Sequence, residues 1–325
     1  MILAGLDEAG YGPLLGPMVV GCAAFSVAGD VQDDWPDLWQ RLRRAVSRKK
    51  SGKQLHVNDS KQVYSPAGGV GSLEKSVLAM LGCRFGAVPA SLRAVLEQVS
   101  PEVLNDLADH PWYRCGAAPA ERPTFPLAID PRGAQIATNA LRFELSRAGV
   151  AIEHVAAKVV LERRLNAMFD QTRNKSAALF SLAAMHLDEL IRKFSDQGLV
   201  VVCDRQGGRE HYGALLRLMF DDWHLQIDHE SEERSAYRLA RGDRVVRILF
   251  TMEAERKCFS TAVASMLGKY LRELLMSGFN AFWLSHLPNL KPTAGYYTDG
   301  LRFLQEIDAV RSALGIDRAL LVRSR

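Results

Sequence analysis

Two adjacent acidic residues, Asp7 and Glu8, stand where the short apolar run 2–6 gives way to a glycine-rich segment. Like charges at neighbouring positions repel each other unless a cation or strong hydrogen-bond donors offset them. Mg²⁺ prefers oxygen ligands and few carboxylates, so a divalent metal would suit this pair. Successive side chains of a strand point to opposite faces, and both acids can reach one metal only where the strand ends or twists. The alternative is an exposed pair of loop acids.

A third acidic residue, Asp204, directly follows the apolar run Leu199–Cys203. Sheets in α/β proteins commonly place functional sites at the carboxyl ends of their strands, so this position also favours a site. A helix N-cap or a loop acid would explain Asp204 without any chemistry.

Two further acids, Glu253 and Glu255, precede the segment 260–276, which is rich in small and aliphatic residues and is predicted to be a helix. Its small residues would let such a helix pack closely against a sheet. Acids at a helix start also interact favourably with the helix dipole, which is a sufficient structural explanation for them. The three acidic segments indicate a site together, and none does so alone.

The segment Gly10–Gly16 has glycines spaced as in loops that bind dinucleotides. However, Pro13 and Pro17 stand where the helix of such a motif should begin, and no phosphate-binding lysine followed by serine or threonine is present in the segment. A nucleotide-binding transferase is therefore a weak alternative, and it would predict affinity for nucleotides.

The chain that must position these residues has 325 residues, of which 48% are hydrophobic and 24% charged. These values are typical of a globular protein with a sizeable core. The formal net charge of +4 is compatible with nucleic-acid binding but does not select it. The N-terminal residues have no basic leader, and no long apolar stretch follows, so we expect a cytoplasmic protein without a signal peptide or membrane span.

The five cysteines form no Cys-x-x-Cys pair and have mostly apolar neighbours. This favours buried free thiols over disulfides or a zinc site. The cysteines are Cys22, Cys83, Cys115, Cys203 and Cys258.

Periodicity and turn residues predict strands and helices along most of the chain. We expect strands at 2–6, 18–27, 54–57, 153–160, 199–203, 225–229 and 245–251. We expect helices at 37–46, 72–81, 91–99, 134–148, 175–194, 213–220, 260–276 and 299–314. The Pro- and Gly-rich stretch 110–133 is expected to be a long surface loop. Strands at the start, followed by strand–helix alternation, predict an α/β fold with a mixed sheet.

In this order, the segments resemble the motifs of the type 2 ribonuclease H family, which comprises ribonucleases HII and HIII. The opening Gly5–Gly16 resembles the family's Gly-x-Asp-Glu-x-Gly-Arg-Gly-Pro-x-x-Gly motif, and the run 58–61 matches its Asn-Asp-Ser-Lys motif. Further matches are Asn174 with the helix after it, the strand Leu199–Asp204, the helix 260–276 and the Gly-Tyr-x-Thr segment 295–298. The matches cover residues 1–65 and about 174–315. The resemblance implies a ribonuclease H-like α/β fold with a mixed central sheet flanked by helices.

The resemblance implies four catalytic, metal-binding carboxylates, three of which are Asp7, Glu8 and Asp204. In the family the fourth lies fourteen residues before the lysine of the small-residue helix, and counting back from Lys269 gives Glu255, with Glu253 as the fallback. Glutamate at this place resembles the ribonuclease HIII variant of the motif. The implied cofactors are Mg²⁺ or Mn²⁺, in a two-metal mechanism that leaves a 5′-phosphate and a 3′-hydroxyl.

The implied partner is an RNA–DNA hybrid or a DNA duplex that contains ribonucleotides, bound by a monomer. Selecting RNA requires contacts to the 2′-hydroxyl. The backbone of Gly10, Tyr11 and Gly12 could approach a phosphate or sugar closely, because glycine lacks a Cβ. Lys61 would pair with a phosphate, and Tyr296 would contact the sugar near the cut. A solvated lysine and a packed aromatic are the alternatives at these two positions.

The sequence departs from the family pattern in three places. Tyr11 replaces an arginine, and because a phenol cannot make a cationic bidentate contact, recognition of a single embedded ribonucleotide is left open. Arg205 stands where type 2 members typically have glycine. The span from Lys61 to Asp204 is long for the family, which predicts an atypical insertion at about 83–160 within a single catalytic domain, 1–325.

Two alternatives to this function remain open. One is a nuclease of the same fold that cuts another structured nucleic acid. The other is an inactive relative that binds hybrids without cutting them. Four retained acids argue against the second, because burying carboxylates without a metal is costly.

Overall fold

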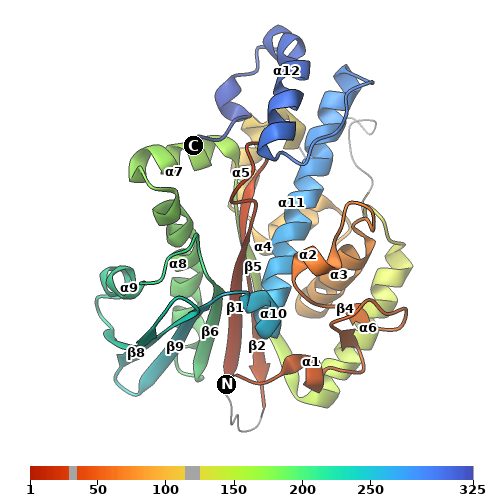
Figure 1. Ribbon diagram of the computed structural model, residues 1–325. Helices are drawn as coiled ribbons and strands as arrows, with labels where there is room; N and C mark the ends of the chain where they lie inside the picture. The colour runs from red at the N-terminus through yellow and green to blue at the C-terminus, as the bar shows by residue number, and fades with distance from the viewer. Residues whose placement is uncertain (29–34, 114–124, 325) are drawn as a thin grey trace.

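A seven-stranded mixed sheet lies at the centre of the molecule (Figure 1). The computed structural model describes residues 1–28, 35–113 and 125–324. In spatial order the strands are β5 (Val150–Val160), β2 (Met18–Val27), β1 (Ile2–Ala9), β6 (Leu199–Asp204), β9 (Arg244–Thr251), β8 (Arg234–Arg241) and β7 (His224–Glu230). Strand β1 lies between the antiparallel β2 and the parallel β6, and β9 runs parallel to β6. This confirms the predicted α/β fold with a mixed central sheet flanked by helices.

Long helices cover both faces of this sheet. Successive residues of β1 belong to two different cores: Leu3 packs in the same core as the helix α11 (Phe259–His286), whereas Ile2, Ala4 and Leu6 pack with α8 (Lys175–Phe194). A strand buried on both faces has this two-residue alternation. By the same alternation, Asp7 lies on the α11 face of β1.

Two glycines let α11 lie very close to the sheet. A Cβ at Gly5 would stand 2.1 Å from the backbone nitrogen of Thr261, and one at Gly21 would stand 2.2 Å from the carbonyl oxygen of Ala264. A side chain at either position would push the helix away, so the glycines set the distance between α11 and the sheet. The first turns of α11 are thereby held against β1 and β2.

Shorter elements surround this core. The helices are α1 (Leu38–Arg41), α2 (Ser60–Val63), α3 (Gly71–Phe85), α4 (Leu92–Val99), α5 (Val103–Asp106), α6 (Pro131–Ala148), α7 (Glu162–Thr172), α9 (Gly213–Met219), α10 (Ala254–Lys257) and α12 (Tyr297–Ala313). A two-stranded parallel sheet joins β3 (Val46–Ser47) to β4 (Leu55–His56), and the 3₁₀ turns are η1 (Leu107–Asp109), η2 (Pro111–Tyr113) and η4 (Arg318–Leu320). Within the described part of the chain, every helix is too short or too polar to cross a membrane.

Several predicted elements differ from those observed. The helix predicted at 37–46 is wrong: Asp37 caps the single turn α1, and the chain then turns so that Val46 can pair with Leu55. Strand β8 and helix α7 were not predicted, and α11 continues ten residues past Met276 to His286. The rest of the predicted helices and strands are present with shifted ends.

The stretch 110–133 is only partly the surface loop that its composition predicts. Trp112 and Tyr113 are buried, and Trp112 packs edge-on against Phe279 of α11. Residues 114–124, including Cys115, lie outside the described residues. The other four cysteines are free thiols; Cys22, Cys203 and Cys258 are buried as predicted, whereas Cys83 is only partly buried.

The last part of the range 83–160 forms a strand of the central sheet. Strand β5 pairs with β2 along its whole length, from Val160 beside Met18 to Val150 beside Val27. The helices before it, α3 and α6, pack on each other beside the sheet. That the range is an insertion relative to a family, and that 1–325 is one domain, remain predictions.

Candidate metal centre

Three carboxylates meet at one end of the central sheet. Strands β1 and β6 run parallel with Leu6 beside Cys203, so the residues that follow emerge at the same edge. One carboxylate oxygen from each of Asp7, Glu8 and Asp204 lies within 4.8 Å of the others. The end of β1 thus brings together two neighbouring side chains that a regular strand would send to opposite faces.

The neighbouring strand β9 delivers a fourth carboxylate. After β9 the chain turns at Glu253, which has a positive φ of 53°, and α10 begins. The backbone N–H of Ala254 donates to Asp204 Oδ1 at 3.0 Å, which draws the first turn of α10 to the acids. Glu255 is only 7% exposed, and burial and the nearby charge of Asp204 raise its pKa. Glu253 instead points outward and pairs with Arg256 at 2.5 Å.

We call Asp7, Glu8, Asp204 and Glu255 the acid cluster. Burial, and then the charges of Glu8 and Asp204, raise the pKa of Asp7 well above its ordinary value. Burial and the charge of Asp204 raise the pKa of Glu8 to about 8 and that of Glu255 to about 7. Burial also raises the pKa of Asp204. At neutral pH the four groups therefore need either protons or a cation.

The donor set fits a hard divalent cation. All four groups offer oxygen ligands, which Mg²⁺ and Mn²⁺ prefer. Glu255 Oε2 is buried and has no hydrogen-bond partner among the described residues, so it is available as a ligand. The charge of Lys61 lowers the pKa of Glu8, Asp204 and Glu255, but this lysine is exposed. One solvated cation is weak compensation for four carboxylates.

Two polar side chains next to the acid cluster were not assigned from the sequence. The hydroxyl of Ser265 of α11 donates to Ser60 Oγ at 3.0 Å, and the Ser265 side chain beside Asp7 lowers the pKa of Asp7. Asp59 caps α2 by accepting the N–H of Lys61 at 2.9 Å, and lies 3.4 Å from Arg256. Asp59 stands in the matched run 58–61 and Ser265 in the small-residue helix, so both lie in segments that the family resemblance already covered.

The glycine loop between β1 and β2 turns its carbonyls inward. Gly10 has a φ of 84°, and a Cβ there would stand 2.7 Å from the Pro17 carbonyl oxygen. The Arg323 guanidinium donates to the carbonyls of Gly10, Pro13 and Gly16, the last at 2.6 Å. The N–H groups of Tyr11 and Gly12 make no hydrogen bond within the described part of the chain. They are free to bind an anion beside the acid cluster.

A second buried charge cluster lies under this loop, and we call Glu162, Arg272 and Arg323 the loop anchor. Glu162 Oε1 accepts the Gly16 N–H at 3.0 Å and the Tyr113 hydroxyl at 2.9 Å. Arg272 donates to the carbonyls of Leu15 and Ala294. Sequence reasoning missed all three residues, because none stands near the loop in the sequence.

The remaining predicted substrate contacts lie around the glycine loop. Tyr11 is partly buried, and burial and the charge of Glu8 raise its pKa. Tyr296 is 60% exposed at the start of α12, and the Gly295 carbonyl before it accepts the N–H groups of Leu14 and Leu15. Its neighbour across this surface is Tyr64, whose pKa is raised to about 12, chiefly by burial. No contact joins Tyr296 to the acid cluster in the described residues.

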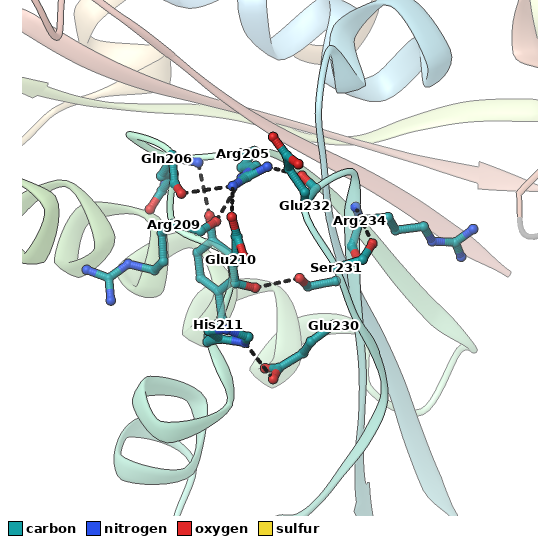
Figure 2. Close-up of polar contacts among 12 residues, drawn as sticks. Arg205, Gln206, Arg209, Glu210, His211, Glu230, Ser231, Glu232 and Arg234 are labelled. Carbon is teal, nitrogen blue, oxygen red and sulfur yellow. Dashed lines mark hydrogen bonds and ion pairs between the residues drawn. The ribbon is translucent and has the colours of Figure 1, made fainter.

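Arg205, the residue after Asp204, has a structural role. Its guanidinium donates to the carbonyls of Arg209 and Gly208 and to that of Glu232 across the loop, and it pairs with Glu210 at 3.2 Å (Figure 2). These contacts tie the loop after β6 to the turn between β7 and β8. An arginine here therefore anchors the loop that follows Asp204 and turns away from the acids.

Comparisons with known proteins gave matches among solved structures only. No model of a known protein family and no curated protein matches the chain. The matching structures include ribonuclease HII of Archaeoglobus fulgidus in its PCNA complex, with 15% identity over 100% of this chain and 95% of that chain and a TM-score of 0.47. Ribonuclease H2 of Pyrococcus horikoshii matches with 12% identity over 99% of this chain and 92% of that one and a TM-score of 0.41. Bst-RNase HIII in complex with Mn²⁺ matches with 14% identity over 99% of this chain and 66% of that chain, with a TM-score of 0.48. The chain is thus similar to solved structures of ribonucleases HII and HIII, at 12–15% identity.

Proposed function

We propose that this protein is a metal-dependent endoribonuclease that hydrolyses the RNA strand of RNA–DNA hybrids. The observation that carries the proposal is the acid cluster: Asp7, Glu8 and Asp204 converge, Glu255 lies beside them, and the pKa values of all four are raised. One oxygen of Glu255 is buried without a hydrogen-bond partner among the described residues. Perturbed carboxylates of this kind mark functional sites more often than structural ones. Residues of β1, β6 and α10 supply them, in the order that the family resemblance requires.

Asp7, Glu8, Asp204 and Glu255 would hold two Mg²⁺ or Mn²⁺ ions. When bound, the ions would supply an activated water and stabilise charge on the departing 3′ oxygen, leaving a 5′-phosphate and a 3′-hydroxyl. The chain's own contribution is rigidity: α11 is pressed against β1, and the Ala254 N–H holds one oxygen of Asp204.

The groups that would bind the nucleic acid surround the acid cluster. The N–H groups of Tyr11 and Gly12, which have no acceptor among the described residues, can donate to a phosphate or to a sugar hydroxyl. Lys61 is exposed beside the acids and can pair with a phosphate, and Tyr296 offers an exposed ring beyond the glycine loop. The choice of RNA rests on the motif resemblance. A monomeric state and a cytoplasmic location are further predictions from the sequence.

The test is cleavage of three matched 5′-labelled duplexes with Mg²⁺ or Mn²⁺: a full RNA–DNA hybrid, a DNA duplex with one ribonucleotide, and an all-DNA duplex. We expect cuts only in strands that contain ribonucleotides, with loss of cutting in Asp7→Asn and Glu255→Gln. Glu253→Gln is the matched control, because Glu253 is two residues from Glu255 but lies outside the cluster. Binding of the hybrid without cutting would favour the inactive-relative reading, and cutting of another structured substrate would favour a different nuclease.

A further inference from the structure

Helix α6 exposes a second apolar stripe in addition to the one that faces the core. Its buried residues include Ala134, Leu141 and Leu145. Ile136 and Phe143 lie on another side and are 69% and 71% exposed, with the exposed Ala140 between them. Residues spaced by three and four positions share one face of a helix. The isoleucine and the ring are two helical turns apart on a helix that already buries its core face, and with Ala140 between them they form a continuous apolar stripe, the kind of surface that favours a binding site.

This stripe forms one wall of a groove of about 600 Å³, which we call the α6 groove. Arg44, Lys53 and Lys75 line it together with the stripe, and α6 lies on the same side of the molecule as β4 (Figure 1). None of these three cations has an ion pair within the described residues. The acid in the lining, Glu144, is held by Arg147 at 2.6 Å and so is already neutralised. The groove is therefore both apolar and positively charged.

A basic segment connects the α6 groove to the acid cluster. The run 48–53 contains four exposed cations, which are Arg48, Lys49, Lys50 and Lys53. At its beginning, Arg48 donates to the carbonyl of Arg256, which directly follows Glu255, at 2.6 Å, and the Arg48 carbonyl accepts the Asn58 side chain at 3.1 Å. At its end, Lys53 lines the groove. Five residues span at most about 17 Å, roughly the length of five stacked nucleotides.

We propose that the α6 groove binds single-stranded nucleic acid that continues from the hybrid held at the acid cluster. Arg44, Lys53 and Lys75 would bind its phosphates, and an unpaired base would stack on Phe143. Basic side chains that track a backbone, with an exposed ring on which bases stack, are the features of single-strand binding surfaces. Duplex bases are already stacked, so the ring favours an unpaired strand. The inference rests on the proposed function for the position of the hybrid, but the groove can be tested by itself.

The experiment compares a blunt RNA–DNA hybrid with the same hybrid carrying a single-stranded DNA tail. With the wild-type chain we expect the tail to lower KM about tenfold, within the range for one stacked base. Phe143→Ala, and separately Lys53→Gln with Lys75→Gln, should remove this advantage and leave kinetics on the blunt hybrid unchanged. Leu218→Ala and Arg217→Gln on α9 are matched controls, since both residues are exposed and far from the groove in the sequence. The proposal would be overturned if the wild-type chain had equal KM values for the tailed and the blunt hybrid. It would also be overturned if the variants raised KM equally for both hybrids.

A binding measurement separates this proposal from the nuclease proposal. A labelled oligothymidine should bind the full chain with an affinity that falls with salt, and the Lys53→Gln/Lys75→Gln variant should reduce the salt slope by about 1.4, or 0.7 for each phosphate contact. If no duplex is cut but this binding depends on Phe143 and the two lysines, the groove stands and the nuclease proposal fails. If polyglutamate binds with the same dependence and oligothymidine does not bind, the groove serves an acidic protein segment and the proposal is wrong.

Discussion

Two buried clusters of charged side chains lie on either side of the glycine loop, and they differ in how their charges are balanced. In the loop anchor, the Glu162 carboxylate accepts two hydrogen bonds, and the charges of His110 and Arg323 oppose the rise that burial causes in its pKa. Burial, with the charge of Arg272, lowers the pKa of Arg323 to about 10, and this guanidinium caps three carbonyls. The acid cluster instead has four acidic groups, three of which lie within 4.8 Å of one another, and one exposed lysine beside them.

The difference separates a structural cluster from a functional one. Buried ions are tolerated when opposite charges balance them, and the loop anchor combines one carboxylate with two guanidinium groups within the chain. Glu162 Oε2, Arg272 Nε and Arg323 Nη2 are nevertheless buried without a hydrogen-bond partner among the described residues, so charge sign, and not hydrogen-bond satisfaction, distinguishes the clusters. The acid cluster has no such balance of signs, so its compensation has to come from outside as protons or metal. Burial alone would not have distinguished the two clusters. Each prediction below changes the balance in one of them.

The largest expected effect is loss of cleavage when the acid cluster loses a ligand. Asp204→Asn should lower the rate of hybrid cleavage by more than about a hundredfold, the upper range for residues that merely support a metal ligand. Its metal-free thermal stability should be unchanged or higher, because the substitution removes one of four repelling charges. Calorimetric melting and single-turnover cleavage check the two halves. A large fall in stability would mean that Asp204 has the same kind of role as the loop anchor.

The loop anchor should show the opposite pattern. Arg323→Met removes a cation that balances the charge of Glu162 and removes the hydrogen-bond donor of three carbonyls. We therefore expect the free energy of unfolding to fall by about 3 kcal/mol. At roughly 3 °C for each kcal/mol, the melting temperature should fall by about 10 °C. Metal affinity should change little, because Arg323 contacts no member of the acid cluster in the described structure. Arg318→Met, at an exposed position nearby, is the control. Unchanged stability with lost metal binding would contradict this assignment.

The sequence predicts the acid cluster better than the loop anchor, for a physical reason. Asp7, Glu8 and Asp204 each follow a buried apolar strand, and strand ends have local signatures. The family resemblance placed Glu255, by its distance of fourteen residues from Lys269. The loop anchor joins Gly16 to Glu162 across 146 positions and to Arg323 across 307. Pairs so distant have no shared periodicity or motif, and only the folded chain brings them together.

The same reasoning explains why some of the predicted elements were wrong. Segment 37–46 has helical spacing, but the pairing of Val46 with Leu55 outweighs this local helix propensity. Trp112 and Tyr113 stand in a Pro- and Gly-rich stretch, yet burial against α11 outweighs the composition around them. The strand order, with β1 between β2 and β6, also depends on contacts distant in the sequence. Local patterns predict the types of element, and tertiary packing decides their ends and their neighbours.

A smaller effect is expected from pH in the absence of metal. Carboxyl groups of the unfolded chain titrate near pH 4, whereas the pKa of Glu255 is about 7 and that of Glu8 about 8 in the fold. Between about pH 4.5 and pH 8 the folded state therefore binds more protons than the unfolded state, and stability falls as pH rises. Metal at a hundred times its Kd should add about 2.7 kcal/mol to the free energy of unfolding. The affinity of the site for metal should increase with pH, because protons compete for the same oxygens.

Melting temperatures at stepwise pH, with EDTA or with Mn²⁺, measure this coupling. Glu8→Gln should flatten the metal-free slope, and Glu253→Gln should leave it as it is, since Glu253 lies outside the cluster. A flat profile for the metal-free wild type would mean that the acids are balanced within the chain after all, and the distinction between the two clusters would disappear.

The smallest effect concerns Ser265, whose side chain opposes the rise that burial causes in the pKa of Asp7. Its hydroxyl favours the ionised form of Asp7. Ser265→Ala should therefore raise the pKa of Asp7 further and weaken Mn²⁺ binding near pH 7 by up to about tenfold, the lower end of the range for groups that support metal ligands. Titration calorimetry at two pH values checks this, and the loss should shrink at higher pH, where Asp7 no longer needs help to ionise. Ser260→Ala is the matched control, because Ser260 is equally buried in α11 but contacts Cys258. If both variants weaken binding alike, Ser265 acts through packing of the helix, and the acid cluster has even less internal compensation than the structure indicates.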